Sequence, residues 1–223
     1  MTDPEQGSAD HSAYPTAVYY DAANRLGLTI GLQGVAPVSA ASQLCGPAYT
    51  VRFGPGPAAH PGVGLYEIID GAPRGAVIIV EVGQPLWIAG ENTTRFAELA
   101  GMAGFVTDGA IRDTEALSAS SLPIHSAGRS VVGYKTLLNL QSWGDPIRCG
   151  GMTVQSGDTI VGDADGVVCL PANRRDEIEF EAGDIMELDR ALSRAIEARL
   201  PLDELGRIRD QWGRRRPSTT TGT

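Results

Sequence analysis

Short apolar runs rich in β-branched residues recur along this chain, separated by segments of helical periodicity, and this alternation restricts the fold more than any other feature. Glycine bounds most of the runs, where a chain turns or two backbones come close. Runs of this length and composition predict buried strands. We expect strands over residues 48–53, 76–82, 105–107, 131–135, 159–161 and 167–170, and helices over residues 16–26, 93–101, 113–120 and about 173–199. The pattern predicts an α/β fold with a large sheet content.

The chain is long enough to bury a substantial core. It has 223 residues, of which 42% are hydrophobic and 20% are charged, as in one globular domain or two closely packed halves. The first residues are small and polar, and the end from Arg214 onward is basic and then rich in threonine. We therefore expect a disordered tail over residues 1–13, a single domain over residues 14–205 and a C-terminal tail over residues 206–223.

Charge, apolar run length and cysteine spacing restrict the partners and the compartment. The formal net charge is −9, whereas nucleic-acid binding needs clustered lysine and arginine, so we expect no nucleic-acid partner. No apolar run reaches the roughly 20 residues that cross a bilayer, so we expect no membrane contact. Cys45, Cys149 and Cys169 are too widely spaced for a shared metal and are interpreted as buried small hydrophobes in a reducing compartment. The expected location is cytoplasmic.

One polar segment, residues 90–94, directly precedes a helical pattern and has the features of an anion site. Its sequence is Gly-Glu-Asn-Thr-Thr, and either Asn92 or Thr93 can cap the helix that follows. The apolar face of that helix is expected to consist of Phe96, Leu99 and Ala100. Free backbone amides and the positive end of the helix dipole can bind a carboxylate without a basic side chain.

A second segment carries an arginine and a carboxylate at the end of a predicted strand. A turn at residues 108–109 is expected to follow the strand, and Arg112 and Asp113 then open the next helix. Functional groups of α/β sheets tend to collect at such strand ends. Arg112 can point towards a substrate oxygen and Asp113 towards a cation, since one carboxylate with several waters is a common Mg²⁺ site. Glu91 precedes Arg112 by 112 − 91 = 21 positions and can lie beside it.

The order and spacing of these motifs resemble those of the RraA-like family over roughly residues 15 to 205. The motifs are Glu91 with residues 108–113 (Asp-Gly-Ala-Ile-Arg-Asp), residues 46–51 (Gly-Pro-Ala-Tyr-Thr-Val), residues 149–154 (Cys-Gly-Gly-Met-Thr-Val), Gly157-Asp158 and residues 163–168 (Asp-Ala-Asp-Gly-Val-Val). The family includes class II pyruvate aldolases that cleave 4-hydroxy-4-methyl-2-oxoglutarate and 4-carboxy-4-hydroxy-2-oxoadipate and decarboxylate oxaloacetate. The resemblance implies a β/β/α swivelling fold, assembled as a trimer or a dimer of trimers with the active site at a subunit interface.

The resemblance also implies a role for each matching residue. Asp113 would ligate Mg²⁺ or Mn²⁺ directly, and Glu91 would bind the metal through water. Arg112 would bind the pyruvyl oxygen and stabilise the enolate, and a small 2-oxo acid would be the substrate. An acidic residue from a neighbouring subunit would also bind through water, with Glu187 as the best match. The implied substrate-binding residues are Gly90, Asn92, Thr93 and Arg112.

Some positions depart from the family pattern or allow a second interpretation. Many members carry Asp at the position of Glu91, and an acidic residue where this chain has Ala116 beside Glu115. Glu179 and Glu181 lie near Glu187 in the sequence and are alternatives to it. His125 can line the pocket, but a packing role is the commoner one for such a histidine. Asp163 and Asp165 lack the rest of a calcium loop and are interpreted as turn formers.

The implied activity is that of a metal-dependent lyase that cleaves a 4-hydroxy-2-oxo acid or decarboxylates oxaloacetate through a pyruvate enolate. A Schiff-base route has little support, because Lys135 is the sole lysine and lies outside the motif. The sequence also lacks a Gly-x-Ser-x-Gly nucleophile elbow. The alternative is a non-enzymatic regulator, since RraA proteins bind and inhibit an RNA-degrading endonuclease with the same fold, and fold does not decide function.

Overall fold

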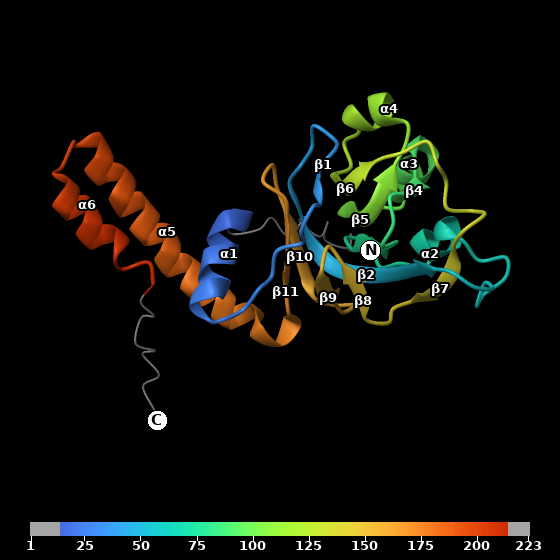
Figure 1. Cartoon of the computed structure of the whole chain (residues 1–223), viewed down its shortest axis with the longest axis horizontal. Helices are drawn as coiled ribbons and strands as arrows, with labels where there is room; N and C mark the ends of the chain where they lie inside the picture. Colours follow the sequence, from blue (N-terminus) through green and yellow to red (C-terminus); the bar gives the residue numbers. More distant parts are fainter. Residues whose placement is uncertain (1–13, 214–223) are drawn as a thin grey trace, which may run out of the picture.

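A computed structural model describes residues 14–213 and shows a sheet-based body with a helical arm (Figure 1). The helices are α1 (Thr16–Arg25), α2 (Leu65–Asp70), α3 (Glu91–Leu99), α4 (Thr114–Ser118), α5 (Arg175–Glu197) and α6 (Leu202–Arg209), with a short 3₁₀ helix η1 (Ala172–Arg174) before α5. The strands are β1 (Ala36–Pro37), β2 (Leu44–Gly54), β3 (Val77–Glu81), β4 (Trp87–Ala89), β5 (Gly104–Ile111), β6 (Ile124–Arg129), β7 (Asn139–Trp143), β8 (Ile147–Cys149), β9 (Met152–Val154), β10 (Thr159–Gly162) and β11 (Val167–Leu170).

Nine strands form one sheet in the order β1-β6-β5-β3-β2-β10-β11, with β4 beside β5 and β7 beside β2. The neighbours β2, β3, β5 and β6 are parallel, and the connections between them carry α2, α3 and α4 in turn. Parallel neighbours need such crossover connections, because a tight turn can join only antiparallel strands. Strands β10 and β11 extend the sheet in antiparallel fashion. The expected α/β class is confirmed.

Strand β3 illustrates why an uninterrupted apolar run forms the centre of this sheet. Successive side chains of a strand point to opposite faces. Ile78 and Val80 therefore pack into a cluster with residues of α2 and α3, whereas Val77 and Ile79 pack into a second cluster covered by the β8–β9 hairpin. A strand buried on both faces has no polar face to alternate. Because one sheet passes through both clusters, the body is a single domain, as expected.

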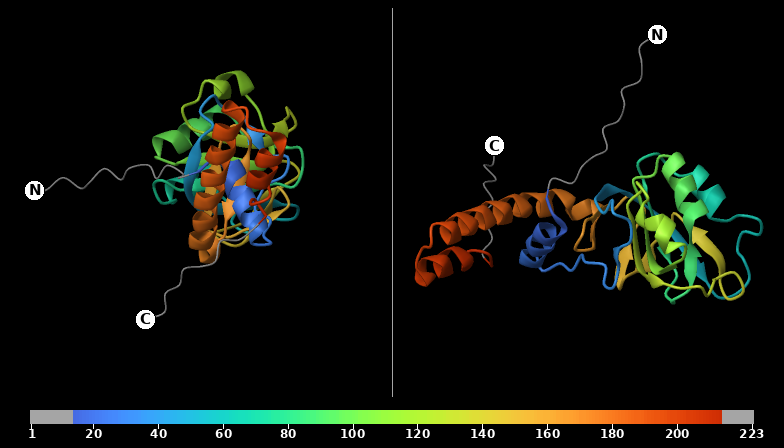
Figure 2. Two further views of the ribbon diagram at one scale, coloured as in Figure 1. Left: turned by 90° about the vertical axis from the view of Figure 1, so that its left-hand side faces the viewer. Right: turned by 90° about the horizontal axis from the view of Figure 1, so that it is seen from above.

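The arm consists of α5 and α6, which extend away from the sheet (Figure 2). Helix α1 packs against the first half of α5, and together they bury a third apolar cluster with β10 and β11. Arg25 of α1 is inside this contact, where its Nη1 lies 2.6 Å from Asp184 and 3.3 Å from Glu181. Arg25 Nε also donates a hydrogen bond to the carbonyl oxygen of Trp212. A charged cluster therefore fixes α1 to α5 and to the end of the described chain.

The helical arm differs from expectation at its end. The long helix was expected over about residues 173–199 and is present as α5, but α6 was not expected. The domain boundary that we placed at residue 205 lies inside α6, which continues to Arg209. The expected tail regions 1–13 and 214–223 lie outside the described residues. None of the helices within residues 14–213 combines the length and the apolar composition that crossing a bilayer demands.

One expected strand is wrong and several short strands were not expected. Residues 131–135 form a loop, paired only through an isolated bridge between Gly133 and Trp87, and Val131 and Val132 are exposed. β-branched residues there suggested a strand, but no neighbouring strand pairs along the segment. The strand next to β5 is instead β6, whose sequence Ile-His-Ser-Ala-Gly-Arg has no β-branched run. The other expected strands are present in β2, β3, β5, β10 and β11.

The buried polar residues near the sheet edge have structural roles. Asp163 forms the turn between β10 and β11, as expected, and accepts hydrogen bonds from the amide (2.9 Å) and hydroxyl (2.7 Å) of Thr16. His125 is fully buried, and its Nε2 lies 3.0 Å from the carbonyl oxygen of Asp163. A carbonyl only accepts, so Nε2 carries the proton and Nδ1 is an acceptor, which has no partner among the residues described. His125 is therefore a packing histidine.

We expect His125 to make the fold less stable in mild acid. Burial lowers the pKa of His125 below its ordinary value of 6.5, against the opposing effect of the Asp163 carbonyl. Between the ordinary pKa and the lowered one, the unfolded chain binds more protons than the folded one, so the free energy of unfolding falls as the pH decreases. Urea titrations from about pH 8 to about pH 5 measure this slope. His125→Gln, which keeps a donor for the carbonyl, should flatten it.

His60→Gln is the matched control, because His60 is exposed and stacks edge-on against Trp143 at 4.6 Å between ring centroids. It should leave the acid slope of the wild type intact. Equal slopes for wild type and His125→Gln would show that His125 does not cause the loss of stability in mild acid.

The cysteines pack as the sequence suggested. Cys149 and Cys169 are buried, whereas Cys45 is partly buried, and all three are outside any disulfide. Burial raises the pKa of the Cys149 and Cys169 thiols, so both stay protonated at neutral pH. Neither thiol is suited to act as a nucleophile or a metal ligand.

Candidate active site

Helix α3 begins at Glu91 with Gly90 as its N-cap, so the expected cap at Asn92 or Thr93 is wrong. The amide of Glu91 instead donates a hydrogen bond to Oδ2 of Asp113 at 3.2 Å. A carboxylate 22 positions away in sequence thus performs the capping. Asn92 and Thr93 lie in the first helical turn, where backbone amides have no acceptor within the helix. These two amides can therefore still bind an anion.

Strand β5 delivers Arg112 and Asp113 to the start of α3. The turn expected at residues 108–109 is wrong: β5 continues through it with an irregularity in its pairing to β6. Oδ1 of Asp108 accepts hydrogen bonds from the amides of Val82 (2.7 Å) and Gly83 (3.1 Å). Asp108 therefore anchors the loop that follows β3, and the strand end lies at Ile111.

The backbone at Asp113 aims its carboxylate back towards α3. Asp113 has φ 59° and ψ 39°, in the left-handed region, and is the N-cap of α4. Aspartate is among the few residues that adopt this conformation readily. The amide of Arg112 donates to the carbonyl oxygen of Ala89 at 3.1 Å, which fixes the preceding residue beside β4. The backbone therefore determines where both charged groups lie.

Gly90 provides the space in which these two side chains meet. A Cβ at this position would lie 2.3 Å from Oδ2 of Asp113 and 3.1 Å from Cγ of Arg112. The backbone of Gly90 is extended, with φ −147°, so other residues could adopt its conformation. The requirement for glycine is thus steric and comes from the site.

We expect Gly90→Ala to cost about 1 to 3 kcal/mol of unfolding free energy, because the new methyl displaces the Asp113 carboxylate from the helix start. Gly128→Ala on β6 is the matched control, since a Cβ there meets no atom within 4 Å. It should change the stability by no more than about 1 kcal/mol. Urea denaturation measures both, and equal effects of the two substitutions would contradict the steric role of Gly90.

The Arg112 guanidinium lies between a carboxylate and an aromatic ring. Its Nε is 3.5 Å from Oδ2 of Asp113, and its Cζ is 3.9 Å from the centroid of the Trp87 ring. The side chains of Arg112 and Asp113 are 49% and 42% exposed, so both reach solvent. Arg112 is held by Trp87, and Asp113 by the amide of Glu91. The role of Trp87 was not foreseen; its apolar run before Gly90 was the only signal in the sequence.

Two adjoining cavities open beside Asp113 and Glu91. One of about 410 Å³ is lined by residues 113–116. The other, of about 250 Å³, lies between α3 and α4 and is lined by Glu91, Arg95 and Ala116 among others. Ala116 borders both spaces. Asp113 thus lines the first cavity and Glu91 the second, and their joint role stays a prediction.

The residues present fit a hydrated divalent metal. Within residues 14–213 no three metal-ligating side chains form a cluster. Mg²⁺ commonly uses one or two protein carboxylates and keeps several waters. Asp113 offers an oriented, half-exposed carboxylate, and Glu91 offers a second one on the adjoining cavity. This hard-oxygen donor set suits Mg²⁺ or Mn²⁺ better than a softer metal.

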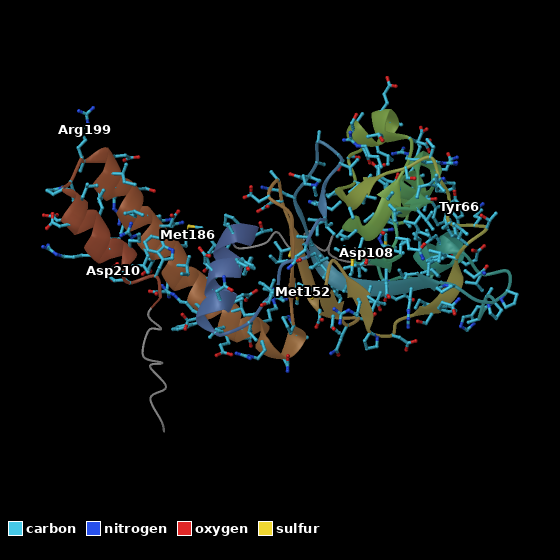
Figure 3. All side chains as sticks on the ribbon, viewed as in Figure 1. Tyr66, Asp108, Met152, Met186, Arg199 and Asp210 are labelled. Carbon is cyan, nitrogen blue, oxygen red and sulfur yellow. The ribbon has the colours of Figure 1, made fainter. Side chains whose placement is uncertain are left out.

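The acidic residue expected from the C-terminal region is not at this site within one chain. Glu187 is exposed on α5, next to Met186, which Figure 3 places on the arm and away from Asp108 in the body. The alternatives have other partners: Glu181 pairs with Arg25, and Glu179 pairs with Arg175 at 2.8 Å. A contribution of Glu187 to a neighbouring subunit stays a prediction.

Comparison with known proteins identifies the relatives of this chain. Residues 16–169 match the family model described as RraA-like, Aldolase/RraA. The chain is 35% identical over 184 residues to a protein of Halalkalibacterium halodurans named "Putative 4-hydroxy-4-methyl-2-oxoglutarate aldolase", covering 82% of this chain and 84% of that protein. The similarity therefore extends over most of both chains.

Solved structures show the same fold. An uncharacterized protein from Pseudomonas syringae pv. tomato superposes with a TM-score of 0.76 at 28% identity, covering 86% of this chain and 92% of the other. Streptomyces coelicolor RraAS2, described as an unusual member of the RNase ES inhibitor RraA protein family, gives a TM-score of 0.72 at 26% identity, covering 81% and 92%. These neighbours confirm the expected fold. The chain belongs to the RraA-like family of aldolases and RraA proteins.

Proposed function

We propose that this protein is a divalent-metal-dependent lyase that acts on a small 2-oxo acid through a pyruvate enolate. The reaction would be aldol cleavage of a 4-hydroxy-2-oxo acid or decarboxylation of oxaloacetate. The observation that carries the proposal is the placement of the Arg112 guanidinium and the Asp113 carboxylate, 3.5 Å apart, at the start of α3. The aldolase name of the Halalkalibacterium relative supports the same class.

Arg112 would act on the oxygen of the 2-oxo group. When the C3–C4 bond breaks, in either reaction, its electron pair moves into the C2–C3 bond and negative charge develops on this oxygen, which produces the enolate. A guanidinium already in place stabilises that charge more in the transition state than in the ground state. The amides of Asn92 and Thr93 at the start of α3 would bind the substrate carboxylate and orient the reacting bond.

Asp113 would ligate Mg²⁺ or Mn²⁺, with Glu91 bound through water. When present, the metal would supply Lewis-acid polarisation of the 2-oxo acid. The Glu91 carboxylate, on the adjoining cavity, would receive through one water the proton that leaves the 4-hydroxyl group during aldol cleavage. In decarboxylation no such proton is released, so this role of Glu91 would be specific to the aldol reaction.

The proposed assembly is a homotrimer or a dimer of trimers in which Glu187 of one subunit completes the site of the next. The exposure of Glu187 on an arm that extends from the body supports this arrangement. Sedimentation velocity of the wild type measures the oligomeric state directly.

A coupled assay tests the activity. Purified protein is incubated with oxaloacetate or a 4-hydroxy-2-oxo acid, with and without Mg²⁺ or Mn²⁺, and released pyruvate is coupled to NADH oxidation. We expect metal-dependent pyruvate release that is lost in Asp113→Ala. Failure to release pyruvate from every such substrate would refute the lyase, and full activity in Asp113→Ala would refute the site.

A second candidate is a regulator that binds an RNA-degrading endonuclease without catalysis. The structural similarity to RraAS2 favours it, because that protein is described as a member of an RNase inhibitor family. Binding of an RNase E-type endonuclease by the Asp113→Ala variant, together with absence of pyruvate release by the wild type, would favour the regulator.

A further inference from the structure

We infer that Trp87 is a positioning residue that holds Arg112 in the orientation needed to stabilise the enolate. The inference rests on the proposed function, which assigns Arg112 to the developing oxyanion. It concerns a residue that contacts Arg112 and neither the substrate nor a metal. Three sets of contacts carry it: those of Arg112 with Trp87, those of Arg112 with Asp113, and those that fix Trp87 itself.

The first contact places the Arg112 guanidinium over the face of the Trp87 ring. Cζ of Arg112 lies 3.9 Å from the centroid of the Trp87 ring, well within the range of about 6 Å in which a cation interacts with an aromatic face. Indole is the strongest natural partner for this interaction, and a guanidinium can stack flat on it. The ring therefore restricts rotation of a side chain that is otherwise 49% exposed.

The second contact turns one edge of the guanidinium towards Asp113. Nε of Arg112 faces Oδ2 of Asp113 at 3.5 Å, on the side where Gly90 lacks a Cβ. Its terminal nitrogens make no hydrogen bond to other residues in the described part of the chain. One edge is thus turned to the carboxylate, and the edge with the terminal N–H groups remains for a substrate oxygen.

Trp87 is itself held by the loop that follows β6. Its amide donates to the carbonyl oxygen of Val132 at 2.9 Å, and its indole Nε1 donates to the carbonyl oxygen of Val131 at 3.2 Å. The ring also fills the space above Gly133, where a Cβ would lie 2.8 Å from it, and meets the Tyr134 ring edge-on at 5.9 Å. The indole is thus held by contacts with residues 131–134.

The loop at residues 131–134 connects Trp87 to the main core and so restricts its movement. Tyr134 packs edge-on against Phe53 of the main core, with ring centroids 5.1 Å apart, so the chain of contacts runs from the core to Arg112. A guanidinium that is oriented in advance needs little reorganisation as charge develops. Removing the aromatic face should therefore reduce transition-state stabilisation more than substrate binding.

Kinetics of three variants test the inference. Trp87→Leu should lower kcat for pyruvate release by about 10-fold with a smaller change in KM, because the guanidinium is no longer held in the orientation that stabilises the transition state. Trp87→Phe keeps an aromatic face and should stay within about 3-fold of wild type. Inhibition by oxalate, which resembles the enolate, should weaken in parallel with kcat. Trp143→Leu removes an indole that stacks on His60 instead and should leave kcat unchanged.

NMR of the wild-type chain supplies a readout independent of activity. The Nε–H proton of Arg112, assigned through its loss in Arg112→Lys, should be shifted upfield by the ring current of Trp87 and return towards the random-coil position in Trp87→Leu. Absence of the shift, native kcat in Trp87→Leu, or equal losses in the Phe and Leu variants would each overturn the inference. If the wild type releases no pyruvate, the proposed function fails, and the NMR result still judges whether Trp87 orients Arg112.

Discussion

Arg112→Lys is expected to lower kcat for pyruvate release by about 100- to 1000-fold, the usual loss when one preplaced oxyanion donor is removed. Lysine keeps the positive charge but lacks the planar guanidinium group. It therefore cannot stack on Trp87 and at the same time present two N–H groups in a fixed direction. The loss should fall on kcat and on kcat/KM to a similar degree, since the interaction forms mainly in the transition state.

Arg95→Lys is the matched control for this substitution. Arg95 lies on α3 and borders the adjoining cavity, but it pairs with Glu98 at 2.6 Å and is 61% exposed. Its replacement should leave kcat within about 3-fold of wild type, because an exposed surface ion pair contributes little. Comparable losses in the two variants would show that the effect does not depend on the position of Arg112.

Arg25→Met is expected to lower the free energy of unfolding by about 3 to 5 kcal/mol, the usual cost of removing one partner from a buried ion pair. The side chain of Arg25 is 2% exposed, and those of Glu181 and Asp184 are 5% and 9% exposed. Methionine fills much of the same volume but removes the positive charge of Arg25 from beside two buried carboxylates. Urea denaturation of the full chain measures the change.

Arg207→Met provides the comparison for Arg25→Met. Arg207 pairs with Asp203 at 2.9 Å one helical turn away, and both side chains are largely exposed, at 73% and 65%. The free energy of unfolding should change by less than about 1 kcal/mol. A loss for Arg25→Met as small as this control would mean that the cluster does not fix α1 to α5.

The central sheet could be predicted from local sequence because its strands are buried on both faces. The run Val77–Glu81 has no polar alternation to obscure it, and the same holds for residues 105–107 and 167–170. Strand β6 could not be found this way, because its buried His125 and Ser126 are polar and are satisfied mainly by contacts with distant segments or their own backbone. The β-branched residues 131 and 132 predicted a strand that is absent, because no neighbouring strand pairs along them.

The sequence by itself determined which residue types stand at the candidate site. The adjacent pair Arg112 and Asp113 after a buried strand, and Glu91 at a fixed spacing before them, can be read directly from the chain and from its resemblance to the RraA-like family. Local periodicity was sufficient for this part because a strand and the residues that follow it are set by neighbouring sequence.

Only the tertiary structure decided how those residues are held. Asp113 caps a helix that starts 22 positions earlier, Gly90 leaves room for it, and Trp87 lies against Arg112. Each of these contacts joins segments that meet because β4 and β5 are paired in the sheet. Sequence patterns record the preferences of a residue and its near neighbours, whereas contacts across the sheet depend on which strands pair. The local sequence thus determines which residues occupy the site, whereas the pairing of the strands determines the contacts that hold their side chains.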